Sequence, residues 1–463
     1  MSGYALSRPA SVGRRRTAVL VALAAAPVLA AVLALVLAAY PLELPLAVAA
    51  GLGLVLVLVL ALTNHQAAAA LGFGLLGIVL YEPAPTDLVF FVVIAVALVT
   101  GRLRLQSVPP AVIGILGVFI ALNLLSAVEV VDVTHALVFF ATTVYMIVFG
   151  LWMTGWVTNR RRAKLAMGGY LIAAVAACAM GLVALYVAIP GRDLIVGEGR
   201  IVALFKDPNV FGPFVIPVAL VLVEEILSPR LFRMRRATKG VLVLVLALGV
   251  LFSYSRGAWA NLAVGLAVLL TVLALRRGGG RKVIPALSLV LVAGLLVAAA
   301  VMVSGSADFL VERAQLQGYD ADRFGAWIAG LEPAQRYPFG IGPGQFEHIA
   351  SISAHSTYVR TIAEQGLPGL LCLAALVIFT LGAALANAVA GRDTHGVGSA
   401  ALLAAWCGII VNSFVIDTLH WRHLWIVAAL IWAAWARRRV SEARVRPYAG
   451  LEASSPGYEM RGT

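Results

Sequence analysis

The chain has 463 residues, of which 62% are hydrophobic and only 12% are charged, and its mean hydropathy is +0.96. A soluble domain of this size has no means of burying so much apolar surface, so the composition excludes a soluble globular protein and predicts a membrane protein. The formal net charge of +13 would suit a nucleic-acid-binding protein, but the basic residues stand in short clusters between apolar runs, which argues against nucleic acid as a partner.

Apolar segments recur along almost the whole chain and predict an all-α fold, a polytopic membrane bundle of about 12–14 transmembrane helices. Several of the segments are short for a span, which needs about 20 residues. A β-barrel would instead show short segments of alternating polarity, and none is present. The predicted segments lie at 17–39, 44–62, 67–81, 87–100, 108–127, 135–155, 165–189, 210–227, 240–253, 257–275, 283–303, 368–390, 399–415 and 423–436.

The loops between these segments alternate in charge. If the N-terminus is cytoplasmic, 26 of the 35 Lys and Arg residues lie on the cytoplasmic side, so the positive-inside rule places both termini in the cytoplasm. The first apolar segment exceeds the roughly 7–15 residues of a signal-peptide core, and we expect it to be an uncleaved span of a multi-pass protein in the cytoplasmic membrane. The predicted parts are a cytoplasmic tail (1–16), N-terminal transmembrane helices (17–189), a catalytic membrane region (190–436) with an outer loop (304–368), and a disordered cytoplasmic tail (437–463).

The three cysteines, Cys178, Cys372 and Cys407, all lie inside apolar segments. Their spacing fits no metal site, and we expect them to pack in the core without forming a disulfide.

Three outward segments are expected to share one face of the membrane: 190–209, 253–257 and 304–368. They hold eight of the nine basic residues that the topology places outside, the ninth being Arg422. Because this face otherwise avoids cations, their clustering predicts a binding site for an anion.

The stretch "RIVALFKDPNVFGP" opens the span that follows the first of these segments. Asp207 is expected to cap that helix with Pro208 at its first position, and Asn209 can serve the same turn. Arg200 and Lys206 have no such local role. We expect Arg200 to contact the anion, with Lys206, Asp207 and Asn209 in support.

The stretch "FSYSRGAWA" places Arg256 between two apolar runs. A charge so close to hydrocarbon is costly, so it marks a partner or a substrate unless the side chain merely reaches back to the interface. The planar guanidinium of arginine binds phosphate oxygens two at a time, which favours a phosphate ligand.

The stretch "DADRFGAWIAGLEPAQRYPFGIGPGQF" predicts a short helix followed by a Gly/Pro-rich loop. No Lys-Ser/Thr follows the glycines and no strand precedes them, so we expect tight turns against the membrane face rather than a nucleotide-binding loop. Arg323 begins the helix, where it either pairs with Asp320 or Asp322 or contacts the substrate.

The stretch "AHSTYVRTIAEQG" places His355 at or next to the start of a helix. The helix dipole there lowers the pKa of the imidazole, and a neutral imidazole is what a general base requires. A capping or hydrogen-bonding histidine is the alternative. Arg360 and Glu364 stand four residues apart and are expected to pair.

In this order, over residues 195–375, the motifs "DPNVFG", "SRGAW", "DRFGAW…PFGIGPGQF" and "AHSTYVRTIAEQGLPGLL" resemble those of the O-antigen ligase and O-antigen polymerase superfamily of bacterial membrane glycosyltransferases. The resemblance implies a GT-C-type enzyme without metal ion or cofactor. Such an enzyme moves a glycan from undecaprenyl pyrophosphate to a hydroxyl of a glycan, lipid or protein acceptor on the outer face of the membrane. The resemblance also implies that His355 is the base and that Arg200 and Arg256 bind the pyrophosphate. Arg323 and Arg360 are weaker matches to arginines of the family.

Elementary chemistry agrees with this interpretation. No nucleotide sugar is present outside the membrane, so a sugar donor there must arrive activated on a lipid. A pyrophosphate leaving group is a weak base that needs stabilisation of its charge more than a proton, and arginines supply this in a pocket of low dielectric constant.

Two other functions suit a polytopic membrane protein. A metal-dependent transferase that uses polyprenyl-phosphate sugars needs acidic residues in its first outer loop, which here is "YPLELP" with Glu43 as its one carboxylate. A transporter or flippase predicts ionisable or broken helices near the middle of the membrane, related as internal repeats. Neither pattern is evident in the sequence. The motifs suit a polymerase and a ligase equally well.

Overall fold

The computed structural model describes residues 44–449 apart from 277–279, 306, 316–317 and 351. This part of the chain is almost entirely helical, which confirms the predicted all-α, polytopic membrane bundle. The predicted N-terminal tail (1–16) and first apolar segment (17–39) lie outside the described residues. The longer helices are α2 (Leu44–Thr63), α3 (His65–Gly74), α4 (Pro85–Val99), α5 (Pro110–Ser126), α6 (Val133–Trp156), α7 (Arg160–Tyr186), α9 (Pro208–Leu227), α10 (Arg236–Phe252), α11 (Arg256–Leu275), α12 (Gly280–Ser304), α14 (Gly318–Leu331), α16 (Thr357–Val389), α17 (Ser399–Asn412) and α18 (Arg422–Ala449).

Every predicted apolar segment within the described residues contains a helix. Six of the described helices are long and apolar enough to cross a membrane. The number becomes seven if α12 and the short α13 (Ala307–Ala314), which meet at a bend of 109°, are one broken span. The other apolar helices are shorter or extend beyond the fully described residues, so the predicted number of 12–14 spans stays a prediction.

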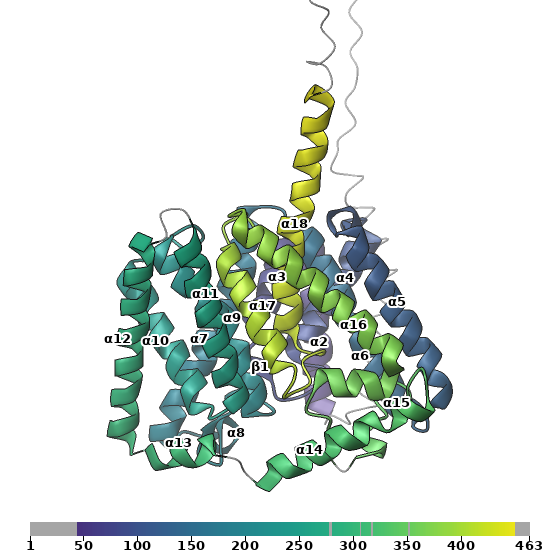
Figure 1. The fold of residues 1–463 in the computed structure, drawn as a ribbon, viewed down its shortest axis with the longest axis horizontal. Helices are drawn as coiled ribbons and strands as arrows, with labels where there is room; N and C mark the ends of the chain where they lie inside the picture. Colours follow the sequence, from purple (N-terminus) through teal and green to yellow (C-terminus); the bar gives the residue numbers. More distant parts are fainter. Residues whose placement is uncertain (1–43, 277–279, 306, 316–317, 351, 450–463) are drawn as a thin grey trace, which may run out of the picture.

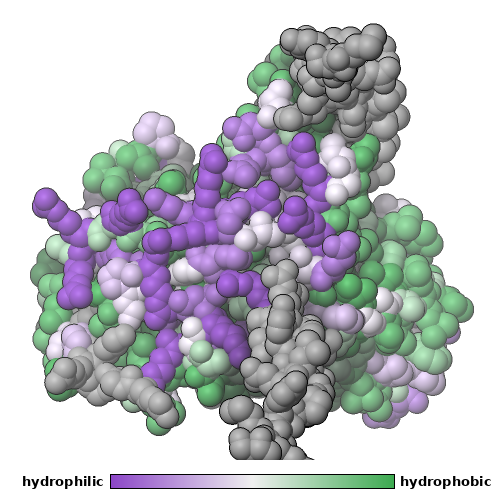
Figure 2. Space-filling view, turned by 90° about the horizontal axis from the view of Figure 1, so that it is seen from above, coloured by the Kyte–Doolittle hydropathy of each residue, from purple (hydrophilic) through white to green (hydrophobic). Residues whose placement is uncertain are grey.

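The two ends of the bundle differ in structure. At one end, here named the loop end, the 14-residue helix α14 and the short helices α8 (Arg192–Ile195), α13 and α15 (Pro333–Arg336) lie across the ends of the membrane-spanning helices (Figure 1). The opposite end, from which the last turns of α18 project, is here named the basic end. Seen from above, hydrophilic residues gather in the middle of the basic end and hydrophobic residues surround them (Figure 2).

Hydrogen bonds and an ion pair join the loops of the basic end. The side chain of Arg160 donates to the carbonyl of Arg230, and the Arg230 guanidinium pairs with Asp393 at 2.5 Å. Arg437 of α18 donates to the Asp393 carbonyl at 3.4 Å. Cationic loops that were predicted to share one face therefore do meet at one end of the molecule. Its position on the cytoplasmic side stays a prediction.

Helix α3 is too short to cross a membrane. Its ten residues span about 15 Å, roughly half of the hydrocarbon thickness. After Gly74 the chain continues without helix through the buried residue Leu76 and into strand β1 (Ile78–Val79). Gly77 lies so close to α7 that a Cβ atom there would come within 2.9 Å of the Ala173 carbonyl oxygen. Irregular backbone is tolerated within a membrane bundle where protein, not lipid, surrounds it.

Two pairs of two-residue strands stand before α9. Strand β1 pairs in parallel with β4 (Leu204–Phe205), and β2 (Val196–Gly197) pairs antiparallel with β3 (Arg200–Ile201). These pairings link the segment after α3 to the segment that carries Arg200, and so connect the N-terminal helices to the loop end.

The three cysteines are free, as predicted, and Cys178 is buried in the main apolar core. Helix α18 continues to Ala449, into the segment predicted to be a disordered tail, while residues 450–463 lie outside the described residues. The sequence "ARRRVSEARV" is rich in strong helix formers, which explains why the helix continues past its apolar part.

Candidate functional site

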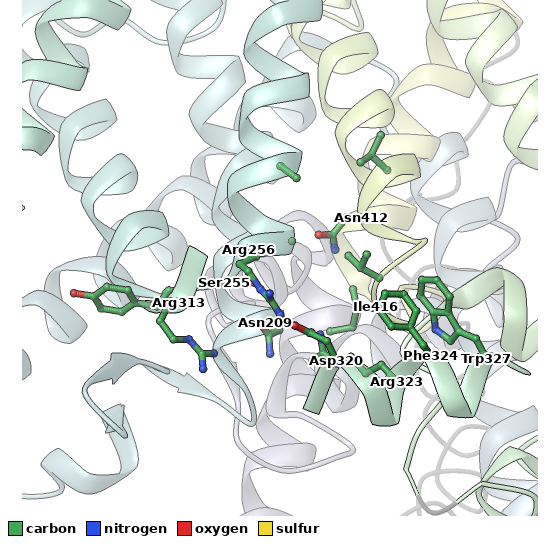
Figure 3. A pocket seen from close by; sticks show the side chains of 15 residues that line it. Asn209, Ser255, Arg256, Arg313, Asp320, Arg323, Phe324, Trp327, Asn412 and Ile416 are labelled. Carbon is green, nitrogen blue, oxygen red and sulfur yellow. Dashed lines mark hydrogen bonds and ion pairs between the residues drawn. The ribbon is translucent and has the colours of Figure 1, made fainter. Parts of the chain in front are cut away.

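A cavity of about 310 Å³ opens at the loop end. Its wall is built from segments far apart in the sequence: the start of α9, the turn between α10 and α11, helices α13 and α14, and the end of α17 with the loop that follows (Figure 3). The charged residues of the wall are Arg256, Arg313, Asp320 and Arg323. Three arginines around one small cavity make it suited to an anionic ligand.

Arg256 is the first residue of α11. Ser255 caps this helix by accepting a hydrogen bond from the Ala258 amide at 3.3 Å. The Arg256 guanidinium pairs with Asp320 of α14 at 2.5 Å and donates to the carbonyl of Gln315 at 2.9 Å. A phosphate bound here would meet the guanidinium and the positive end of the α11 dipole together. The sequence predicted a partner or a substrate for Arg256. In the structure that partner is the carboxylate of Asp320 on α14.

Arg200 stands behind the cavity wall and holds it in shape. Its buried side chain donates from Nε to the Ser253 carbonyl at 3.0 Å, and from Nη2 to the Tyr254 carbonyl at 3.4 Å and the Asn209 amide oxygen at 3.3 Å. The sequence suggested no local role for this arginine, and that prediction is wrong. Arg200 binds the carbonyls at the end of α10 and so fixes the turn that presents Arg256.

The other residues of this motif have structural partners. Asp207 caps α9, as predicted: its carboxylate accepts a hydrogen bond from the backbone N–H of Asn209 at 2.6 Å, and Pro208 lies in the first turn. Asn209 contributes to the cavity wall. Lys206 pairs with Glu82 at 3.0 Å in an exposed ion pair and does not line the cavity.

Helix α14 supplies one side of the cavity and also contacts the His355 segment. Arg323 lines the cavity, and of the two aspartates proposed as its local partners, Asp320 pairs with Arg256. Trp327 lines the cavity as well, and its indole nitrogen donates to the carbonyl of Ala354 at 2.9 Å. This bond anchors the residue directly before His355.

His355 lies immediately before Ser356, the N-cap residue of α16, as predicted. Its backbone has a left-handed φ of 43°, an unusual conformation for a residue other than glycine. Partial burial lowers the pKa of His355, and the nearby charge of Arg323 lowers it further, although Asp207 acts in the opposite direction. The direction agrees with the prediction, and burial is the largest of these causes. His355 stands beside the cavity and not in its wall.

Arg360 is enclosed by carboxylates. Its guanidinium pairs with Glu364 at 2.8 Å, with Asp417 at 2.9 Å, and with Glu347. Only 7% of the side chain is exposed, and it does not line the cavity. Burial acts to raise the pKa of Glu347, but the hydrogen bond and charge of Arg360, together with the Glu347 backbone amide and His135, lower the pKa overall.

The Arg360–Glu364 pair also holds the glycine-rich loop in place. The Glu364 carboxylate accepts hydrogen bonds from the amides of Gly344 (2.9 Å) and Phe346 (3.3 Å). Gly340 has a φ of 82°, and a Cβ atom there would collide with the backbone of Glu364. Gly340, Gly342 and Gly344 all have positive φ, so the glycines make tight turns as predicted. Gly340 turns against α16 and Gly344 against α6, while the predicted contact of this loop with the membrane face stays a prediction.

Replacing Arg360 by alanine should destabilise the protein strongly. The change leaves Glu364, which is fully buried, without its cation, at a cost of about 3–5 kcal/mol. The melting temperature of the detergent-solubilised protein should fall accordingly. Arg336→Ala is the matched control, because Arg336 forms a four-residue-spaced pair with Glu332 but is 73% exposed. Equal melting temperatures for the two variants would contradict the structural role of Arg360.

The sequence interpretation missed several residues of the site. Asp320 was considered only as a local partner of Arg323, and Arg313 only as one of the outward cations. Asn412 is an isolated amide near the end of an apolar segment, which is itself a sequence signal for a functional polar residue. Asp417, which pairs with Arg360 outside the cavity wall, lies in the loop between α17 and α18 and has no distinctive sequence context.

Among the described residues, no group of three or more His, Cys, Asp and Glu side chains is arranged to hold a metal ion. The polar residues that line the cavity include three arginines, one aspartate and two asparagines. The excess of cations over anions and the presence of amides suit an anion bearing hydroxyl groups.

Residues 241–374 match a protein family described as O-antigen ligase. The match covers Arg256, Arg323, His355 and Arg360, and leaves Arg200 outside, 41 residues before its start. It confirms the resemblance to the O-antigen ligase and polymerase superfamily that the sequence motifs indicated. No match to the chain was found among curated proteins.

Proposed function

Because residues 241–374 carry an O-antigen ligase domain within a helical membrane bundle, we propose that this protein is a glycosyltransferase that moves a glycan from undecaprenyl pyrophosphate to an acceptor hydroxyl. The acceptor is a growing glycan, another lipid or a protein, and the reaction takes place on the outer face of the cytoplasmic membrane. The observation that carries the proposal is the cavity at the loop end, which three arginines line and beside which His355 lies.

In this proposal Arg256 and Arg323 bind the pyrophosphate of the donor, with Arg313 at the rim. The acceptor oxygen attacks the anomeric carbon of the donor sugar. The bond from that carbon to the pyrophosphate oxygen breaks with its electron pair, and undecaprenyl pyrophosphate leaves. Charge grows on the leaving oxygen as the bond breaks, and arginines fixed beside it stabilise that charge more than they stabilise the ground state.

His355 acts as the general base and takes the proton of the acceptor hydroxyl as the new glycosidic bond forms. Only the neutral imidazole can do this, and the lowered pKa of His355 keeps it neutral at physiological pH. The proton then passes to water, which restores the base. Trp327 and the Ser356 cap hold the segment on either side of His355, so the imidazole stays in place.

The remaining residues of the motifs position these groups. Arg200 and Asn209 fix the turn before Arg256, and Asp207 starts α9. Arg360 and Glu364 are assigned to the scaffold that joins α16 to the glycine-rich loop, and not to the pyrophosphate.

The pH dependence of transfer tests the assignment of His355. Activity requires the neutral base, so it is present above the pKa of His355 and lost as the pH falls through it. Because that pKa is lowered, the acidic limb of kcat/KM should lie below pH 6.5. The charges that act on His355 come from Arg323, Asp207, Arg360 and Asp417.

Two variants should move this limb in opposite directions. Arg323→Gln removes a cation and should raise the pKa, whereas Asp207→Asn removes an anion and should lower it. Asparagine also caps helices well, so the second variant keeps α9 intact. An acidic limb that is the same in all three proteins would contradict His355 as the base.

A direct assay tests the function itself. The purified protein is incubated with an undecaprenyl-pyrophosphate-linked oligosaccharide and an acceptor, with and without EDTA. We expect transfer in both conditions. Loss of transfer with EDTA would favour a metal-dependent transferase instead.

A further inference from the structure

The cavity is lined not only by arginines but also by aromatic rings and a buried asparagine, which a phosphate ligand alone would not require. In Figure 3, Arg313 and Arg256 lie toward the left and centre, the rings of Phe324 and Trp327 lie toward the right, and Asn412 lies above. Phe324 and Trp327 meet edge to face at 5.4 Å, and half of the Phe324 side chain is exposed. An apolar aromatic surface beside a buried amide differs from a site built for phosphate alone.

Asn412 is the unusual member of this wall. It ends α17, it is only 1% exposed, and neither its amide oxygen nor its amide nitrogen has a hydrogen-bond partner within the described part of the chain. Gly257 provides the space for it, since a Cβ atom at Gly257 would come within 3.0 Å of the Asn412 oxygen. Buried amides are almost always satisfied, so a bare one that lines a cavity points to a ligand that completes it.

The chemistry of the amide selects the kind of ligand. An amide offers two donors on nitrogen and an acceptor on oxygen. A phosphate group has acceptors only and would leave the Asn412 oxygen unsatisfied beside negative charge. A sugar hydroxyl donates and accepts, so one or two hydroxyl groups satisfy both ends of the amide.

We infer that Asn412 is a specificity-determining residue that hydrogen-bonds the hydroxyl groups of the donor sugar next to the pyrophosphate. This inference rests on the proposed function, because it places the sugar beside a pyrophosphate held by Arg256. The apolar face of the sugar ring packs against Trp327, the aromatic residue that also anchors the segment before His355. Asn412 therefore recognises the sugar, while the arginines recognise its activated leaving group.

Binding measurements separate these two roles. The probes are undecaprenyl pyrophosphate without sugar and undecaprenyl pyrophosphate linked to glucose, galactose or N-acetylglucosamine, each titrated into the full-length protein in nanodiscs. The wild-type protein should bind at least one sugar-bearing probe more tightly than the bare one. Asn412→Ala should weaken the affinity for that sugar-bearing probe by about tenfold and leave the affinity for the bare lipid unchanged. Arg256→Ala should weaken both.

Asn261 provides the matched control. It lies on α11 in the same helix pair, it is fully buried, and its amide also lacks a partner among the described residues, but it does not line the cavity. It packs against Gly408 of α17 much as Asn412 packs against Gly257. Asn261→Ala should therefore leave the affinity for every probe unchanged. Asn412→Leu, which keeps the side-chain volume, guards against a loss caused only by an empty space, and melting temperatures report the folding of each variant.

The outcomes are distinct. Equal weakening of the sugar-bearing and bare probes in Asn412→Ala, or no weakening of either, would overturn the role of Asn412 while leaving the proposed function intact. The same holds if the wild-type protein binds no sugar-bearing probe more tightly than the bare lipid. If the wild-type protein binds no undecaprenyl pyrophosphate at all, or Arg256→Ala changes nothing, the proposed function fails with it.

Discussion

Replacing His355 by alanine should lower the rate of glycan transfer by about 10²–10⁴-fold, the usual contribution of a general base. The acceptor hydroxyl would then have to lose its proton to water during the attack. Donor binding should stay close to that of the wild-type protein, because His355 stands beside the cavity and the pyrophosphate is held by arginines. Single-turnover transfer rates and the donor Kd, measured separately, distinguish the two effects.

His348→Ala is the matched control for this experiment. His348 lies in the same outer segment, in the short 3₁₀ helix η3 (Phe346–His348), and is exposed. Its replacement should change neither the rate nor the Kd. A His355→Ala variant that transfers at the wild-type rate would remove His355 from the chemistry.

Replacing Arg256 by alanine should lower kcat/KM by about 10²–10³-fold, since it removes a fixed charge from the position where the leaving group develops its own. Arg256→Lys should recover only part of the loss, because an ammonium group cannot bind two phosphate oxygens with a planar fork. Steady-state kinetics with an undecaprenyl-pyrophosphate-linked donor measures both.

The ion pair between Arg256 and Asp320 requires a second comparison. Arg256→Ala leaves the Asp320 carboxylate without its guanidinium partner, and part of any loss could reflect that charge. Adding Asp320→Asn removes the charge. If Arg256 binds the donor, the double variant should stay as slow as Arg256→Ala. Recovery of activity in the double variant would instead assign Arg256 to the scaffold.

The fold was largely predictable because its determinants are local. Long apolar segments have few alternatives to a helix in a membrane, and the Asp207-Pro208 start of α9 is a capping signal within two adjacent residues. Helix α3 departs from the pattern because its neighbours decide its end. Gly77 permits close contact with α7, and β1 finds its partner in β4, which lies after α7 in the chain.

The site was predictable only in part. Arg256, Arg323 and His355 carry unusual chemistry in short motifs, and such residues can be found without a structure. The roles of Arg200 and Arg360 depend on partners that the fold brings from elsewhere, such as the Ser253 carbonyl and the Asp417 carboxylate. A sequence shows a cation but not whether the fold encloses it with carbonyls, with carboxylates or with a ligand.

The missing hydrogen-bond partners of Asn412 likewise cannot be recognised from the sequence. Its amide is unusual only because α11 presents Gly257 at that point and no hydrogen-bonding group. Which groups surround a residue in one helix is set by the packing of a second helix about 150 residues away in the sequence.

The most direct test of the central claim is the stoichiometry of the reaction. The purified protein in liposomes is given an undecaprenyl-pyrophosphate-linked glycan and an acceptor, and mass spectrometry counts the products. We predict one undecaprenyl pyrophosphate released for each glycan joined to the acceptor in the wild-type protein, and neither product in His355→Ala or Arg256→Ala. Movement of the intact lipid-linked glycan across the bilayer, without release of undecaprenyl pyrophosphate, would contradict the claim and identify a transporter.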